Sequence, residues 1–123
     1  MKIIEAIMLA DGTARNDIEQ AVKLQWLSTV DGLLAREVFD QYEGTEVNFQ
    51  GYDGETDQKE TDLLAPAPWD ELYVNYLVMR IYLIQEEIER YNNAALVYAE
   101  SLRRFENHMN QTHRHKSIRA LRF

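Results

Sequence analysis

The sequence contains no cysteine, and this absence excludes two kinds of site. Without thiols the chain can form neither a disulfide framework nor a thiolate metal site, and it fits a reducing compartment. Long apolar runs are absent too: the first ten residues are largely apolar, but Glu5 interrupts them and Asp11 follows at once. A signal peptide or a membrane span needs a longer uninterrupted segment. We therefore expect a soluble protein that is not exported.

Proline and glycine are also scarce, and neither occurs in residues 69–109. In this stretch Pro68 can occupy the first helical turn, and Asp70 and Glu71 supply the negative charge that a helix N-terminus favours. The apolar residues keep a spacing of three and four, which is typical of an amphipathic helix. They are Tyr73, Tyr76, Leu77, Ile81, Ile84, Ile88 and Tyr91.

A single helix over residues 69–111 would extend about 60 Å, too long for a lone globule of 123 residues. The only candidate break is Tyr91-Asn92-Asn93, because asparagine tolerates left-handed backbone and caps helices. We therefore expect two helices, or one long bent helix. The second half has its own apolar stripe of Ala94, Val97, Tyr98, Leu102, Phe105 and Met109.

The N-terminal part of the chain predicts two further helices. Residues 3–10 form a short one, which the turn residues Asp11-Gly12-Thr13 end. Asn16 is then expected as the N-cap of a long helix over residues 17–42, with Glu19 completing a variant of the capping box. Its apolar stripe is wide and consists of Ile18, Val22, Trp26, Leu27, Val30, Leu33, Leu34 and Val38.

Residues 44–68 are predicted to be an irregular, protruding connection. Residues 47–52 alternate briefly between apolar and polar side chains, which allows a short β-hairpin arm. Residues 52–62 are acidic and rich in turn formers, and a connection of this length is usually functional or disordered. We expect Leu63 and Leu64 to return to the core. Trp69 is then expected to pack on the second helix near Trp26 or Leu33.

These patterns together predict an all-α fold. Residues 1–112 form one helical domain with a protruding loop, and residues 113–123 form a basic tail. The net charge is −8, and it is unevenly spread. Residues 1–71 carry 16 acidic and 5 basic side chains, whereas residues 72–123 carry 5 acidic and 8 basic ones. A protein this acidic overall is a poor candidate for binding nucleic acid on its own. Its basic tail can still contact phosphate groups or an acidic patch on a neighbouring subunit.

The acidic clusters do not match known metal or catalytic motifs. Glu86, Glu87 and Glu89 form the densest cluster, but none of them has a histidine three residues later, as a ferritin-like di-metal site requires. Residues 53–57 lack the register of a calcium loop. Nucleophile, phosphate-loop and dinucleotide motifs are absent. We therefore expect no catalytic residue, no metal and no cofactor, and not an enzyme.

The aromatic side chains indicate an interaction surface. Tyrosine and tryptophan occur on more than one face of the last helices, and both are enriched at protein interfaces. The alternative is that these rings are half-buried at the rim of the domain, with their hydroxyl groups in water. The interface candidates are Phe49, Tyr52, Tyr73, Tyr76, Tyr82 and Tyr98.

Four blocks carry a resemblance to a family of small proteins encoded in tailed phages and prophages of Firmicutes. They are LQWLSTVDG at residues 24–32, FQGYD at 49–53, LLAPAPWDELY at 63–73, and YNN at 91–93 with NQTH at 110–113. The resemblance covers about residues 1–115, and the chain departs from it in having Gln111 where arginine is expected. The family resembles the head–tail connector proteins of siphophages, which form rings below the portal and pass DNA through their lumen.

This resemblance implies a non-enzymatic structural protein that assembles into a homo-oligomeric ring. A ring of twelve subunits is one size that it allows. The partners it implies are the phage portal protein and an adaptor on the tail side. Non-specific contact with the DNA in the channel is also implied, and binding to a membrane is not. The location would be the virion, and the host cytoplasm during assembly. The loop at residues 44–62 would contact neighbours or the portal. The tail residues Arg114, Lys116, Arg119 and Arg122 would face the portal or DNA.

Two other functions are weighed against the connector. The first is a small cytoplasmic phage assembly factor, such as a tail-assembly chaperone or regulator, which would bind partners helix-in-groove. The second is a carboxylate-metal enzyme, which the missing histidine ligands argue against.

Overall fold

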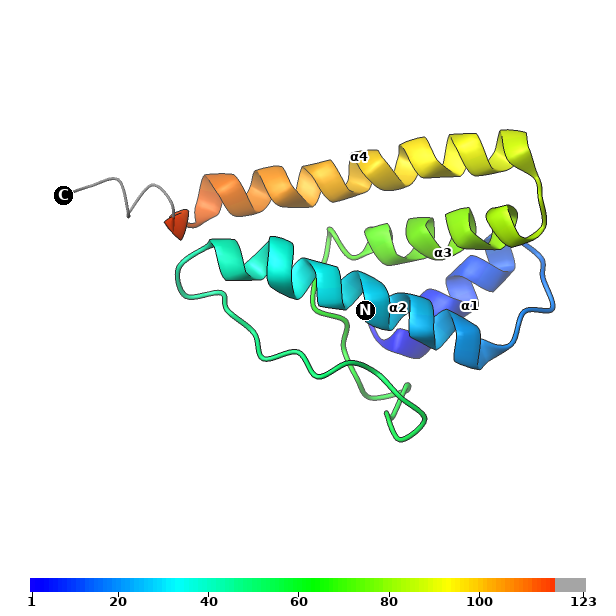
Figure 1. Cartoon of the computed structure of the whole chain (residues 1–123), viewed down its shortest axis with the longest axis horizontal. Helices are drawn as coiled ribbons and strands as arrows, with labels where there is room; N and C mark the ends of the chain where they lie inside the picture. The colour runs from blue at the N-terminus through cyan, green and yellow to red at the C-terminus, as the bar shows by residue number, and fades with distance from the viewer. Residues whose placement is uncertain (117–123) are drawn as a thin grey trace.

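The computed structural model describes residues 1–116 and is all-α over that range (Figure 1). Its elements are α1 (Ile3–Thr13), α2 (Gln20–Glu37), the 3₁₀ turn η1 (Phe39–Gln41), α3 (Glu71–Ile84) and α4 (Ile88–Thr112). The described residues contain no strand, and only two isolated β-bridges occur there, between Lys2 and Asp62 and between Tyr42 and His115. Within residues 1–116, each helix is too short or too polar to cross a membrane.

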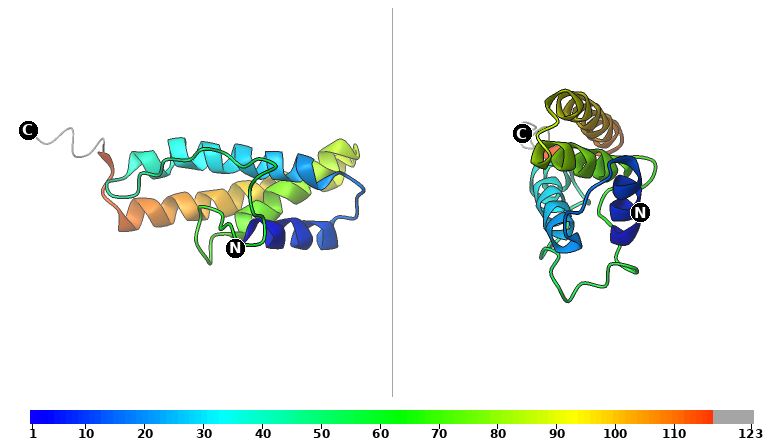
Figure 2. Two further views of the ribbon diagram at one scale, coloured as in Figure 1. Left: turned by 90° about the horizontal axis from the view of Figure 1, so that it is seen from below. Right: turned by 90° about the vertical axis from the view of Figure 1, so that its right-hand side faces the viewer.

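Helix α3 is the centre of the bundle, because α1, α2 and α4 all pack against it. Seen along the helices, α4 lies on one side of α3 while α1 and α2 flank it on the other (Figure 2). This position explains why α3 is apolar on several faces. Its buried side chains are Leu72, Tyr73, Leu77, Val78 and Ile81.

Helix α4 covers α3 unevenly. Its buried side chains are Ser101, Phe105 and Met109, all in the second half of the helix. In the first half, by contrast, Leu96 and Val97 are exposed. The core therefore lies under the C-terminal half of α4, and an apolar surface remains on its N-terminal half.

The break in the C-terminal helical stretch lies at residues 85–87. Two helices form, as favoured from the sequence, and they run antiparallel (Figure 1). The predicted break at Tyr91-Asn92-Asn93 was wrong, because these residues lie inside α4. A reversal at that point would have taken the apolar residue Ile88 into α3 instead.

A Schellman motif makes this reversal without glycine or asparagine. Glu86 has a φ of +60°, in the left-handed region. The N–H of Glu87 donates to the carbonyl of Tyr82 at 3.0 Å, and the N–H of Glu86 donates to that of Leu83 at 3.1 Å. These are the two hydrogen bonds of the motif, which usually has glycine at the left-handed position.

The predicted bounds of the first two helices also need correction. Helix α1 continues through Gly12 to Thr13, and α2 covers residues 20–37 instead of 17–42. Asn16 is not the N-cap: its Oδ1 accepts the N–H of Ile18 at 3.0 Å, which makes a turn before the helix. The cap residue is Glu19, and Val38 ends α2 ahead of the turn η1.

The long connection is held at its far end by α1. The N–H of Ile3 donates to the carbonyl of Thr61, and the N–H of Ile4 donates to that of Gln58, each at 3.0 Å. These two loop carbonyls satisfy donors that the first turn of a helix leaves unpaired. No strand forms at residues 47–52, so the hairpin arm considered from the sequence is absent.

Trp69 packs on α4 and not on α2 as predicted. Its ring is stacked on His108 with centroids 3.6 Å apart and planes 20° apart, and it lies 6.3 Å from Phe105. The prediction was wrong because α4 runs antiparallel to α3, which brings the end of α4 over the start of α3. The expected partner Leu33 is 49% exposed.

Candidate functional site

A buried carboxylate lies at the point where the long loop meets the bundle. Asp31 has no exposed surface, although it lies in the middle of α2. Helical spacing places it on the same face as Leu27 and Leu34, which also point into the core. Burying an ionised carboxylate is costly unless hydrogen bonds compensate it. Asp31 must therefore have partners from elsewhere in the chain.

Three donors supply those partners. The hydroxyl of Tyr73 on α3 donates to Oδ1 of Asp31 at 2.5 Å. The hydroxyl of Tyr52 and the N–H of Leu64 both donate to Oδ2, the latter at 3.1 Å. The Tyr73 hydroxyl also accepts the N–H of Ala65 at 2.7 Å. We call Asp31, Tyr52, Leu64, Ala65 and Tyr73 the loop clamp, since together they join α2, both arms of the loop and α3.

A second set of contacts fixes Tyr52 in place. Its N–H donates to Oγ of Ser28, one turn before Asp31, at 3.0 Å. The preceding Gly51 has a φ of +90°, and a Cβ there would lie 3.4 Å from the same Oγ, so this position favours glycine. The ring of Phe49 meets that of Tyr52 edge-on at 5.0 Å and lies against Gly32. Two of the blocks that carry the family resemblance, residues 24–32 and 49–53, thus pack on each other.

The electrostatics of the clamp favour a permanent structural role. Burial raises the pKa of Asp31, and the hydrogen bonds from Tyr52, Tyr73 and Leu64 oppose that rise only in part. Burial and the nearby Asp31 carboxyl raise the pKa of Tyr52 and of Tyr73. Both hydroxyls therefore remain donors at neutral pH. Asp31 and Tyr73 have no exposed surface.

The structure divides the six predicted interface aromatics between the core and the surface. Tyr73 is completely buried, so its assignment to a partner surface was wrong. Phe49 and Tyr52 are half-buried against α2. Tyr76 and Tyr98 are half-buried and form a pair with centroids 5.1 Å apart. Burial, followed by the effects of Tyr76 and nearby glutamates, raises the pKa of Tyr98 to about 12.

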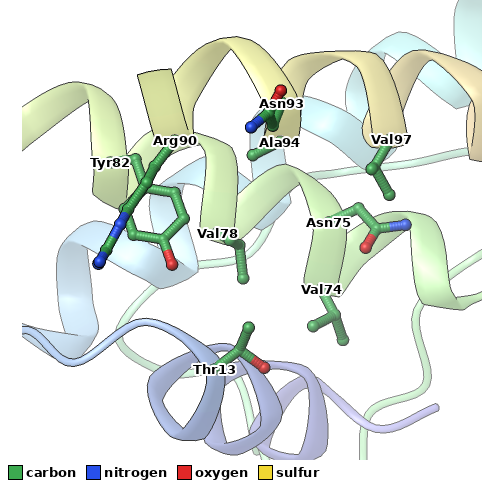
Figure 3. A pocket seen from close by; sticks show the side chains of 9 residues that line it. All are labelled: Thr13, Val74, Asn75, Val78, Tyr82, Arg90, Asn93, Ala94 and Val97. Carbon is green, nitrogen blue, oxygen red and sulfur yellow. The ribbon is translucent and has the colours of Figure 1, made fainter. Parts of the chain in front are cut away.

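Tyr82, the sixth, lines an open hollow between α1, α3 and α4, which we call the α1–α4 groove (Figure 3). The groove has a volume of about 410 Å³. Its apolar wall comes from α3 and α4, and Arg90 lies over the Tyr82 ring at 5.9 Å. The lining residues are Thr13, Val74, Asn75, Val78, Tyr82, Arg90, Asn93, Ala94 and Val97.

The first residues of the predicted tail lie against the start of the long loop. The N–H of Glu43 donates to the carbonyl of Arg114 at 2.9 Å. The ammonium group of Lys116 pairs with Glu46 at 2.9 Å and lowers the pKa of that glutamate. The other two tail candidates, Arg119 and Arg122, lie outside the described residues.

Sequence reasoning missed the two α2 side chains on which the clamp depends, Ser28 and Asp31. A signal was present, because Asp31 lies on the apolar stripe of the predicted helix, where an acid needs a partner. Within residues 1–116, no three potential metal ligands gather at one place. No protein-family model, curated protein or solved structure matches this chain. What the chain does must therefore be argued from its own residues.

Proposed function

We propose that the chain is a non-enzymatic structural protein of a tailed phage. It acts as one subunit of a head–tail connector ring, docks to the portal protein and joins the capsid to the tail. The observation that carries the proposal is the loop clamp. Three of the four blocks that resemble the connector family supply its residues, with Asp31 in the first, Tyr52 in the second, and Leu64, Ala65 and Tyr73 in the third. Ser28, which holds Tyr52 in place, also lies in the first block.

The clamp supports this role because it gives a protruding loop a fixed position. Residues 44–62 contain six acidic side chains and one basic one. Hydrogen bonds hold this acidic segment to Asp31 at its middle, through Tyr52, and just past its end, through Leu64. Residues 58 and 61 are held to the first turn of α1. A pre-organised acidic surface loses little conformational entropy on binding and complements a basic surface on a neighbour. These are the properties that a docking loop in a large assembly requires.

Deletion of the gene from a phage or prophage that encodes the chain tests this proposal. Electron microscopy of the lysate is expected to show heads and tails that are not joined, and the wild-type gene supplied in trans should restore complete particles. Infectious particles in normal yield from the deletion strain would overturn the proposal. Immunoblotting of purified virions separates the two phage roles, since a connector remains in the particle whereas a cytoplasmic assembly factor does not.

A pair of matched variants tests the loop itself. Glu55→Lys with Glu60→Lys reverses two exposed charges on the loop. Asp40→Lys with Glu106→Lys makes the same change in net charge at exposed positions away from residues 44–62. We expect the first variant to fail in joining heads to tails and the second to succeed, with similar thermal melting of the two purified proteins. Equal complementation by both variants would exclude the acidic loop as the docking element.

A further inference from the structure

An exposed stripe on α2 carries no acidic side chain. Residues 1–71 contain 16 acids, yet between Glu19 and Glu37 the only acid is the buried Asp31. Positions 22, 25, 29, 33 and 36 follow helical spacing and form one line on the exposed side of α2. We call them the α2 outer stripe, which consists of Val22, Gln25, Thr29, Leu33 and Arg36. Val22 is 39% exposed and Leu33 is 49% exposed. If this face of α2 contacted only water, we would expect it to carry acidic side chains, as the rest of residues 1–71 does.

The α1–α4 groove is a second uncovered apolar surface. Its wall is formed by valines and an alanine, and Arg90 is its only charged lining residue. On its α4 side Val97 is 54% exposed, and the adjacent Leu96 is 71% exposed. Contiguous exposed apolar residues of this kind mark interaction sites.

We propose that the α2 outer stripe of a second copy of this chain occupies the α1–α4 groove. This assignment rests on the proposed ring and names the two surfaces that would build it. The stripe consists of exposed residues of α2 and the groove is lined by α1, α3 and α4. Helices α1 and α2 lie on opposite flanks of α3 (Figure 2). One copy therefore offers a stripe on one side and a groove on the other. Such a heterologous contact repeats from copy to copy and generates a ring when the rotation closes.

The dimensions of the two surfaces agree. Val22 and Leu33 are eleven positions apart in α2, which corresponds to about 16 Å along the helix. The α4 lining of the groove runs from Arg90 to Val97, seven positions or about 10 Å, and the adjoining hollow extends it to Arg104, fourteen positions or about 21 Å in all. One helix can therefore lie along the groove and the adjoining hollow, with its two apolar side chains spread over their combined length.

Charge complementarity determines the direction in which the second copy lies. Asp17 and Glu19 precede α2, and Arg36 lies at its other end. In the groove, Arg90 lies at one end. The adjoining hollow at the other end is lined by Glu71, Glu100 and Arg104, and Glu100 already pairs with Arg103 and Arg104 of its own chain, which leaves Glu71 as the acid to meet the neighbour. When the N-terminus of the neighbour's α2 lies near Arg90, its acids Asp17 and Glu19 meet Arg90 and its Arg36 meets Glu71. Within one copy, α2 and α4 both begin at this same end of the bundle (Figure 1). The two copies consequently point in the same direction, as the subunits of a ring must.

Cysteine cross-linking tests this contact cleanly, because the natural chain has no cysteine. The double variant Leu33→Cys with Val97→Cys is expected to give a ladder of dimers, trimers and larger species on a non-reducing gel. Either single variant should give no ladder. The matched control is Leu33→Cys with Ile88→Cys, since Ile88 is 59% exposed but does not line the groove. A ladder from the control, dimers from Val97→Cys alone at the same yield, or no ladder from the double variant would each overturn the proposal.

A charge exchange tests the direction of the contact. Arg90→Glu and Glu19→Arg should each weaken self-association in sedimentation by about tenfold, as expected for reversal of one partner in a close interfacial charge pair. The combination of the two should restore it. If the double variant instead lost self-association by the sum of the two single effects, the parallel arrangement would be excluded. Rings seen by electron microscopy without the cross-linked ladder would disprove these surfaces and leave the connector role standing. A cross-linked ladder from a chain whose deletion leaves phage assembly intact would support these two surfaces and overturn the connector role.

Discussion

The hydroxyl of Tyr73 donates a hydrogen bond to Oδ1 of Asp31 at 2.5 Å and accepts one from the N–H of Ala65 at 2.7 Å. This one oxygen joins α3, α2 and the end of the long loop, and Asp31 and Tyr73 have no exposed surface. When such a network is complete it fixes one arrangement of the chain. When a fully buried member such as Tyr73 is lost, the remaining buried groups have no water to replace it.

The first prediction concerns the two tyrosines of the clamp. Tyr73→Phe removes a hydroxyl from a fully buried position and leaves both Asp31 and the Ala65 N–H short of a partner. Each unsatisfied buried group costs about 1–3 kcal/mol, so we expect a loss of free energy of unfolding in this range or above. Tyr52→Phe should cost less, because Tyr52 is only half-buried and water can replace its hydroxyl. Urea unfolding of both variants measures the difference, and an equal or larger effect at Tyr52 would contradict the assignment of Tyr73 as the central donor.

The second prediction concerns the pH dependence of stability. Burial raises the pKa of Asp31 in the folded state above the ordinary value of 3.8, which it has in the unfolded chain. Above the folded pKa, the full cost of burying the charge is present. As pH falls through the folded pKa toward 3.8, the carboxyl becomes neutral in the folded state first, so the wild type gains stability.

Asp31→Asn provides the reference for this measurement, because an amide does not titrate and can still accept one hydrogen bond while donating another. Urea unfolding of both proteins from neutral pH down to about pH 4 should show the difference between them moving in favour of the wild type. Movement in the opposite direction would mean that the three donors outweigh burial and hold the pKa below its ordinary value.

The third prediction concerns the turn between α3 and α4. Glu86 has a φ of +60°, and a left-handed backbone costs a residue with a Cβ about 1–2 kcal/mol relative to glycine. Glu86→Gly should therefore raise the free energy of unfolding, by about 0.5–1 kcal/mol once the added freedom of the unfolded chain is counted. Glu86→Val should lower it. Thermal melting of the two variants decides, and destabilisation by glycine would show that the side chain of Glu86 is needed.

A companion experiment distinguishes this turn from the break predicted at residues 91–93. Asn92→Ala and Asn93→Ala lie inside α4 at exposed positions, where alanine is the better helix former. We expect each change to leave stability unaltered or to increase it by a few tenths of a kcal/mol. A loss of about 1 kcal/mol at either position would instead indicate a helix cap there.

The helical content was predictable from local pattern. The three-and-four spacing of apolar residues correctly indicated an all-α fold and two helices after Pro68. The turn at Glu86 was not predictable, because the residue with positive φ is a glutamate inside a charged run that resembles a solvated helix face. Local propensity identified asparagine as the better candidate, but the chain reverses through the Schellman motif at Glu86.

The loop clamp could not be predicted from the sequence, for a different reason. The partners of Asp31 lie 21, 33 and 42 positions away along the chain, so no local window contains them. The blocks at residues 24–32, 49–53 and 63–73 contain Ser28, Asp31, Tyr52 and Tyr73, but nothing in the sequence shows that these residues meet. For Tyr73 the sequence pattern offered both a core and a surface position, and only the fold distinguishes them.

The last prediction concerns Trp69, whose ring is stacked on His108 at 3.6 Å and lies 6.3 Å from Phe105. These contacts join the start of α3 to the end of α4. Because the ring is half-buried, Trp69→Ala should cost about 2–3 kcal/mol, below the 3–5 kcal/mol typical of a fully buried tryptophan.

A double-mutant cycle with His108→Ala isolates the stacking contribution, for which about 0.5–1.5 kcal/mol is expected from an aromatic pair in this geometry. Trp26→Ala provides a comparison, since Trp26 lies under Arg80, toward the end of α3, whereas Trp69 and His108 meet at its start. It should show no coupling to His108, because mutations without shared contacts are additive. Coupling of His108 to Trp26, or none to Trp69, would mean that the end of α4 does not cover the start of α3. The antiparallel packing of the two helices would then be wrong as well.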